Sequence, residues 1–127
     1  MRMRERSILV VDDDPGILEA VAELLRIEGY EVETAANGVA ALEAIGRSRP
    51  ALVLLDMRMP VLDGWGVARM LAERGIRVPI LVMTAARDGA SWASEIGADG
   101  YISKPFGIGD LLDAVRRGVD RPPLAAN

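Results

Sequence analysis

Three short, unbroken apolar runs constrain the fold of this 127-residue chain more than any other feature. They cover Ile8 to Val11, Ala51 to Leu55 and Ile80 to Met83. A continuous apolar run of this length is typical of a strand that is covered on both faces of a parallel sheet. The three runs therefore predict the central strands of an α/β domain.

Amphipathic patterns between these runs predict helices. In the first, Asp14 is placed to cap the helix, Pro15 occupies its first position and Gly29 ends it. Its apolar stripe consists of Ile17, Leu18, Val21, Leu24 and Leu25. Four further helical patterns begin near Asn37, Asp63, Asp88 and Gly109. The one after Asp88 contains Gly and Ser residues that weaken a helix, so its boundaries are the least defined.

Two additional strands complete the pattern. The segment from Tyr30 to Thr34 alternates apolar and polar residues, which predicts a half-exposed strand at a sheet edge. Gly100 to Ser103 is a weaker strand candidate. Five strands that alternate with five helices, joined by right-handed crossovers, predict a doubly wound (βα)5 domain with helices on both faces. We expect this domain to span residues 1–119, with 120–127 as a tail or the start of a linker.

Composition excludes several classes of chemistry. The chain has no Cys and no His, so thiol nucleophiles, imidazole metal ligands and Ser-His hydrolysis are unavailable. Its formal net charge of −4 argues against a nucleic-acid surface, because phosphate backbones are bound by clustered Lys and Arg. The apolar run after the basic N-terminus is too short for a signal peptide or a membrane span. We expect a cytoplasmic domain that contacts neither nucleic acid nor membrane.

Carboxylates follow two of the predicted central strands. Asp12 and Asp13 come directly after the first strand, and Asp56 comes directly after the third. The carboxyl ends of parallel strands meet at one edge of the sheet, where ligands bind in open α/β folds. Carboxylates held that close repel each other unless a cation neutralises them, and Mg2+ prefers such oxygen ligands. Taken alone, Asp12 and Asp13 fit a structural role in a helix cap and a solvated turn as well as they fit a metal site.

Two further side chains are expected at the same edge. Thr84 follows the fourth strand and Lys104 follows the fifth. Phosphoryl transfer needs an in-line nucleophile, a metal at the phosphate oxygens, and donor or cationic groups on the remaining oxygens. The carboxylates, the hydroxyl and the ammonium together supply that set.

Four motifs resemble the signatures of response-regulator receiver domains, in the family's order. They are ILVVDDDP (8–15), LLDMRMPVLDG (54–64), VMTA (82–85) and GADGYISKPF (97–106). The resemblance covers nearly the whole chain. It implies the flavodoxin-like fold with strand order 2-1-3-4-5, which the residue patterning alone does not specify.

The resemblance also implies roles for the acidic residues. Asp56 resembles the phosphoacceptor. Asp12 and Asp13 resemble the acid pocket, with Asp13 as a direct ligand of Mg2+. The backbone carbonyl of Arg58 resembles a further ligand of the metal.

Other positions resemble the family's phosphoryl-binding and switch residues. Thr84 and Lys104 resemble the hydroxyl and the lysine that hold the phosphoryl oxygens, and Tyr101 resembles the switch aromatic. The bond between Lys104 and Pro105 resembles the family's cis peptide, an isomer that Pro makes accessible. Without the motifs, Tyr101 would be interpreted as a partly buried strand residue with a solvated hydroxyl.

The implied partners are proteins. Since the chain contains no His, the phosphoryl group must come from outside, and the resemblance implies a histidine kinase or a phosphotransfer protein as donor. The face formed by the fourth helix, the fifth strand and the fifth helix would then change its affinity for a downstream protein. Arg58 and Ala86 offer no acidic or amide group to orient an attacking water, so autodephosphorylation is expected to be slow.

Two other classes of protein remain as alternatives. One is a Mg2+-dependent phosphatase of the haloacid-dehalogenase type, because Asp12 and Asp14 have the spacing of its first motif. Gly16 stands where that family has Thr or Val, and that family carries a longer core with a cap domain. The other is a receiver-like binding module that is never phosphorylated. The complete set of acids argues against it, as do Thr84 and Lys104.

Overall fold

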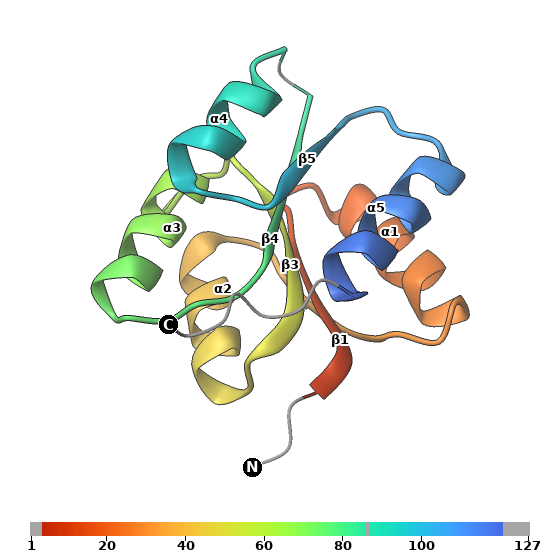
Figure 1. Ribbon diagram of the computed structural model, residues 1–127, viewed down its shortest axis with the longest axis horizontal. Coiled ribbons are helices and arrows are strands. Elements are labelled where there is room, and N and C mark those ends of the chain that lie inside the picture. Colours follow the sequence, from red (N-terminus) through yellow and green to blue (C-terminus); the bar gives the residue numbers. More distant parts are fainter. Residues whose placement is uncertain (1–3, 86, 121–127) are drawn as a thin grey trace.

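The computed structural model describes residues 4–85 and 87–120, in which strands and helices alternate along the chain (Figure 1). The strands are β1 (Arg4–Val11), β2 (Glu31–Ala35), β3 (Pro50–Asp56), β4 (Ile80–Thr84) and β5 (Gly100–Ser103). The helices are α1 (Pro15–Ile27), α2 (Gly38–Arg47), α3 (Gly64–Glu73), α4 (Gly89–Ile96) and α5 (Ile108–Asp120). Asp120, the first residue of the expected tail, thus belongs to α5, and 121–127 lie outside the described residues.

The strands form one parallel sheet in the order β2-β1-β3-β4-β5, which confirms the predicted fold. The alternating strand β2 lies at one edge, as predicted, and its burial changes from exposed at Glu31 to buried at Ala35. The central strand β3 is buried along almost its whole length. The carboxyl ends of β1, β3 and β4 therefore lie side by side, because parallel neighbours end at the same edge of a sheet.

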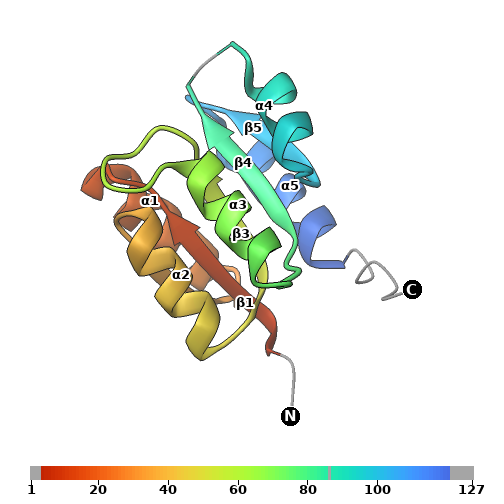
Figure 2. The ribbon, with the colours of Figure 1, turned by 90° about the vertical axis from the view of Figure 1, so that its left-hand side faces the viewer.

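Helices cover both faces of the sheet, with α2, α3 and α4 on one face and α1 and α5 on the other (Figures 1 and 2). Side chains alternate along a strand, so each strand contributes to two cores. Leu9 and Val11 pack with α2, α3 and α4, whereas Ile8 and Val10 pack with α1 and α5. This alternation explains why the central strands are apolar without interruption.

Side-chain caps begin three of the helices where the sequence places them. Asp14, Asn37 and Asp63 each accept a hydrogen bond from a backbone N–H in the first turn of α1, α2 and α3. Helix α4 is different: it has only eight residues, and among the described residues Asp88 makes no capping hydrogen bond through its side chain. Gly97 ends it in the left-handed conformation with φ of 68°. The helix with the poorest sequence pattern is thus also the shortest.

The loop between β3 and α3 packs closely against the end of β3. A Cβ atom at Gly64 would lie 2.8 Å from Cα of Met57 and 3.0 Å from the carbonyl oxygen of Asp56. The amide of Gly64 donates a hydrogen bond to the carbonyl of Met57 over 3.0 Å. Only glycine permits this approach, which holds the loop beside Asp56.

No helix among residues 4–85 and 87–120 has the length and apolar character that a membrane span requires.

The loop between β3 and α3 also contains a strained residue. Val61 has φ of 74° and is 81% exposed. A β-branched residue in the left-handed region is an outlier, because its Cβ atom crowds the backbone carbonyl.

Replacement of Val61 by Asn should therefore stabilise the domain. Asn tolerates the left-handed conformation, so Val61→Asn should raise the free energy of unfolding by about 1 kcal/mol in a urea titration. Val39, an exposed valine within α2, provides the matched control, since Val39→Asn should bring no gain. Equal effects at both positions would contradict backbone strain at Val61.

Candidate functional site

Three carboxylates converge at the carboxyl edge of the sheet. Asp12 and Asp13 follow β1 directly, and Asp56 is the last residue of the adjacent strand β3. One carboxylate oxygen from each residue lies within 4.8 Å of the others. Asp12 and Asp56 are buried, while Asp13 is exposed at the mouth of the cluster. The juxtaposition predicted from the sequence is present in the structure.

Backbone N–H groups orient the two buried carboxylates. Oδ1 of Asp12 accepts a hydrogen bond from the amide of Asp14 at 2.9 Å, and Oδ1 of Asp56 accepts one from the amide of Arg58 at 3.3 Å. Asp14 itself turns away to cap α1 and takes no part in the cluster. The other oxygen of each buried carboxylate contacts Lys104.

Lys104, which follows β5, forms ion pairs with the buried carboxylates at the ends of β1 and β3. Its Nζ lies 2.6 Å from Oδ2 of Asp12 and 3.3 Å from Oδ2 of Asp56. The backbone amide of Lys104 donates to the carbonyl of Thr84 over 2.9 Å, and the peptide bond between Lys104 and Pro105 is cis. The side chain is only 14% exposed, so water screens these ion pairs less than it screens surface pairs.

Burial and neighbouring charges shift the pKa values of two groups in this cluster. Burial raises the pKa of Asp56 above its ordinary value of 3.8, and the charge of Asp12 adds to this effect. Lys104 and the amide of Arg58 lower the pKa of Asp56 but do not cancel the effect of burial. Burial lowers the pKa of Lys104, yet its hydrogen bond to Asp12 and the charge of Asp56 outweigh that effect, so its pKa is raised. Lys104 therefore stays protonated, and its one ammonium pairs with two of the three carboxylates.

The donor set of the cluster suits a hard divalent cation. Three carboxylate oxygens within 4.8 Å of one another can converge on one ion. One ammonium leaves an excess of negative charge when all three acids are ionised, and a cation among them would remove it. Oxygen ligands with one or two charged carboxylates are typical of Mg2+ sites. Asp12, Asp13 and Asp56 could thus hold a metal ion.

Thr84 and Tyr101 occupy different depths on neighbouring strands. Thr84 ends β4 and is 2% exposed, beside the acidic cluster, whereas Tyr101 on β5 is 47% exposed. Gly89, the first residue of α4, lies between them. A Cβ atom at Gly89 would lie 3.0 Å from Cδ2 of Tyr101 and 3.2 Å from Cγ2 of Thr84. Gly89 thus sits where any larger residue would crowd both the buried Thr84 and the exposed ring of Tyr101.

One group of contacts near the site could not be predicted from the sequence. The guanidinium carbon of Arg58 lies 5.1 Å from the centre of the Trp92 ring on α4. Trp92 meets Trp65 of α3 edge to face, with centroids 4.9 Å apart, and Nε1 of Trp65 donates to Glu95 at 2.9 Å. Local sequence patterns do not indicate that Arg58 lies on Trp92, because the two residues are far apart in the chain.

The family model of the response regulator receiver domain matches residues 8–116. The chain belongs to this family. It is thus a receiver domain of the kind found in bacterial two-component systems, as the sequence motifs predicted.

Individual relatives agree with this assignment. The response regulator MprA of Mycobacterium leprae is 46% identical over 112 residues, which are 86% of this chain and 49% of that protein. The chain therefore spans about half the length of the curated relatives it matches. The Francisella response regulator 1452 receiver domain has a TM-score of 0.84 and 27% identity, over 91% of this chain and 98% of that one. The response regulator TrrA of Thermotoga maritima, solved in complex with Mg(2+)-BeF, has a TM-score of 0.80 and 37% identity, over 89% and 98% of the two chains.

The family assignment decides between two of the earlier alternatives. A receiver domain, rather than a haloacid-dehalogenase phosphatase, accounts for the matched residues and for the sheet order. The roles expected of the individual site residues remain proposals.

The electrostatics of the cluster lead to a prediction about stability. Because the pKa of Asp56 is higher in the folded than in the unfolded chain, stability falls as pH rises through the folded pKa. Asp56→Asn removes this charge, and Lys104 keeps Asp12 as its partner. Without divalent metal, the variant should therefore have a higher Tm than the unchanged protein at pH 7.

This difference in Tm should shrink as pH falls toward 3.8, the ordinary pKa of the carboxyl group, and disappear below it, where Asp56 is neutral in the folded and the unfolded chain. Asp113, an exposed acid on α5, provides the control, and Asp113→Asn should change Tm little at any pH. A lower Tm for Asp56→Asn at pH 7 would contradict the net destabilisation by this charge.

Proposed function

We propose that this receiver is a phosphorylatable switch that accepts a phosphoryl group on Asp56 in the presence of Mg2+. The observation that carries this proposal is the position of Lys104, whose ammonium lies between Asp12 and Asp56 beside the exposed carboxylate of Asp13. This arrangement supports the proposal, because phosphoryl transfer to Asp56 would need a carboxylate nucleophile, oxygens that can bind a metal, and a nearby cation at one point on the sheet edge.

The chemistry follows from the positions of the side chains. An oxygen of Asp56 attacks the phosphorus of the donor, a new O–P bond forms, and the bond between the phosphorus and the donor atom breaks. Lys104 then contacts the phosphoryl oxygens as well as Asp12, and the hydroxyl of Thr84 donates to another oxygen. Bound by Asp12, Asp13, Asp56 and the carbonyl of Arg58, Mg2+ would supply positive charge that offsets the charge on the phosphoryl oxygens.

The phosphoryl donor lies outside this chain. These residues contain no His, and we propose that a histidine kinase or a phosphotransfer protein supplies the group in the cytoplasm, as the membership in the receiver family suggests. The side chain of Arg58 lies on Trp92 and has no acidic or amide group that could orient a water toward the phosphorus. Ala86, the other position expected to slow hydrolysis, lies outside the described residues. Slow autodephosphorylation fits these residues.

A solved relative supports the ligand chemistry. TrrA of Thermotoga maritima, 37% identical to this chain, was solved in complex with Mg(2+)-BeF. We infer that the acidic cluster of this chain binds the same pair. Beryllofluoride then serves as a stable substitute for the phosphoryl group in experiments.

The readout we propose uses the face formed by α4, β5 and α5. Phosphoryl oxygens draw the hydroxyl of Thr84 inward, and Tyr101 follows through the crowded region at Gly89, where a Cβ atom would lie within 3.2 Å of both side chains. This local change shifts a two-state element at the start of α4. A downstream protein then binds the altered face, and the domain itself contacts no nucleic acid.

The first prediction concerns uptake of phosphate. Incubation with a small-molecule phosphodonor and Mg2+ should add one phosphoryl group to the protein, as measured by intact mass. EDTA or Asp56→Ala should abolish the added mass. Asp63→Asn is the matched control, because Asn caps α3 as well as Asp does and the nearby acid is not a phosphoacceptor.

Two results would contradict the assignment. Label that persists in Asp56→Ala would place the phosphoryl group elsewhere. A complete absence of uptake by the unchanged protein, with both a small-molecule donor and a histidine kinase, would favour the binding module that is never phosphorylated.

A second prediction concerns transmission to Tyr101. Beryllofluoride with Mg2+ should shift the backbone amide resonances of Gly89 and Tyr101 in 1H–15N spectra. Thr84→Ser keeps the hydroxyl and should preserve these shifts, whereas Thr84→Ala should lose them while resonances around Asp56 still respond. Equal shifts in both variants would mean that the hydroxyl does not drive the change at this face.

A further inference from the structure

Arg58 contacts both the candidate phosphoacceptor and helix α4. Its amide donates to Oδ1 of Asp56 at 3.3 Å, while its guanidinium lies over the face of Trp92 on α4. Arg58 is exposed, but Trp92 is only 9% exposed and packs against Trp65 of α3. One residue therefore links the phosphoacceptor strand to the interface between α3 and α4.

The position of this guanidinium depends on a balance of two attractions. In the resting state, Lys104 pairs with Asp56, and the guanidinium of Arg58 lies on the electron-rich indole face of Trp92. A phosphoryl group brings the charge at Asp56 to about −2 and adds three acceptor oxygens. A charge-assisted bond from guanidinium to phosphate is stronger than an exposed cation–π contact. Phosphorylation therefore reverses the preference.

We propose that Arg58 is a phosphoryl-responsive latch on α4. Its guanidinium rests on Trp92 before phosphorylation and moves to the phosphoryl oxygens afterward, which uncovers the Trp92 ring. The contact between α3 and α4 then becomes a second surface that reports phosphorylation, distinct from the route through Thr84 and Tyr101. This inference rests on the proposed phosphorylation of Asp56.

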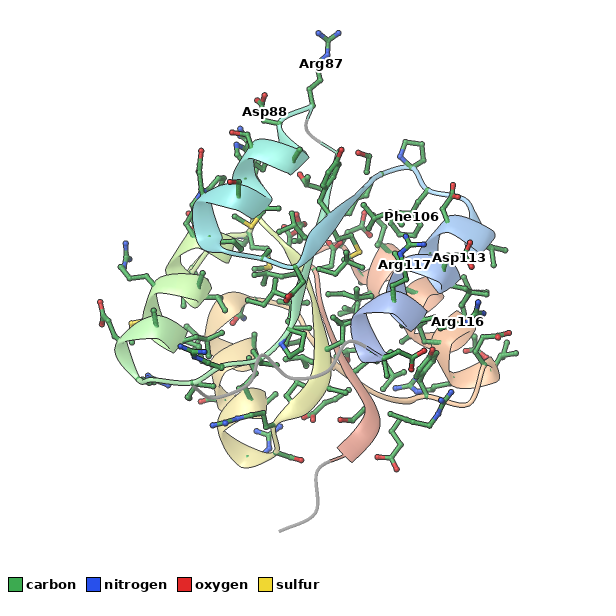
Figure 3. All side chains as sticks on the ribbon, in the orientation of Figure 1. Arg87, Asp88, Phe106, Asp113, Arg116 and Arg117 are labelled. Carbon is green, nitrogen blue, oxygen red and sulfur yellow. The ribbon has the colours of Figure 1, made fainter. Side chains whose placement is uncertain are left out.

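NMR can follow both partners of the latch directly. Protons above an aromatic ring are shielded, so the Nε–H proton of Arg58 should resonate upfield of that of Arg87 in the resting protein. Arg87 is exposed and points away from the domain at the start of α4, which makes it a suitable reference (Figure 3). Beryllofluoride with Mg2+ should move the Arg58 proton downfield and shift the indole N–H of Trp92.

Arg58→Met tests the role of the charge, because Met keeps the length and apolar stem of the side chain without the cation. In the resting state, this variant should place the Trp92 indole N–H near its position in the activated unchanged protein. The half-saturating concentration of beryllofluoride should rise about fivefold, since one charge-assisted contact is lost. Arg87→Met, the matched control, should leave both measurements as they are in the unchanged protein.

The outcomes separate the latch from the phosphorylation itself. If resonances near Asp56 respond to beryllofluoride but the Arg58 Nε–H does not move, the latch is disproved and the proposed function stands. An unchanged Trp92 signal in Arg58→Met would likewise overturn the latch, and because Arg58 is exposed, this substitution leaves the buried core intact. If no resonance near Asp56 responds and no phosphoryl group is taken up, both proposals fail together.

Discussion

The ammonium of Lys104, held between Asp12 and Asp56, is the interaction on which the rest of the site depends. It brings the end of β5 to the ends of β1 and β3, and it offsets part of the repulsion between two buried carboxylates. Burial still raises the pKa of Asp56, so the ammonium of Lys104 does not fully offset the cost of keeping the ionised carboxylate buried. A site whose negative charge is only partly neutralised favours the binding of a cation. In the function proposed above, the same lysine contacts the oxygens of the phosphoryl group.

The fold brings this cluster together through elements with separate roles. The parallel sheet puts the ends of β1, β3 and β4 side by side, and the caps Asp14 and Asp63 start the helices that follow β1 and β3. Gly64 lets the loop after β3 approach the strand end, which places the amide of Arg58 on Asp56. The stability of the two cores allows the edge of the sheet to hold unfavourable charge.

Around this rigid edge lie contacts that a change in charge can alter. Gly89 leaves no room for a Cβ atom between Thr84 and Tyr101, while Arg58 reaches Trp92, which is also on α4. Helix α4 is short and lacks a side-chain cap among the described residues. Both features lower the free-energy cost of moving α4, and the two readouts proposed above depend on such a movement.

The sequence alone determined the alternation of strands and helices and the edge position of β2, because burial and periodicity appear in the local pattern of apolar residues. It also placed the candidate site residues at the ends of strands: Asp12, Asp13, Asp56, Thr84 and Lys104. Strand order came only through the resemblance, since apolar runs do not say which strands pair. The tertiary structure decided which oxygens Lys104 contacts, how deeply each acid is buried, and that Arg58 lies on Trp92. These features depend on distances between residues far apart in the chain, and local sequence patterns contain no information about such distances.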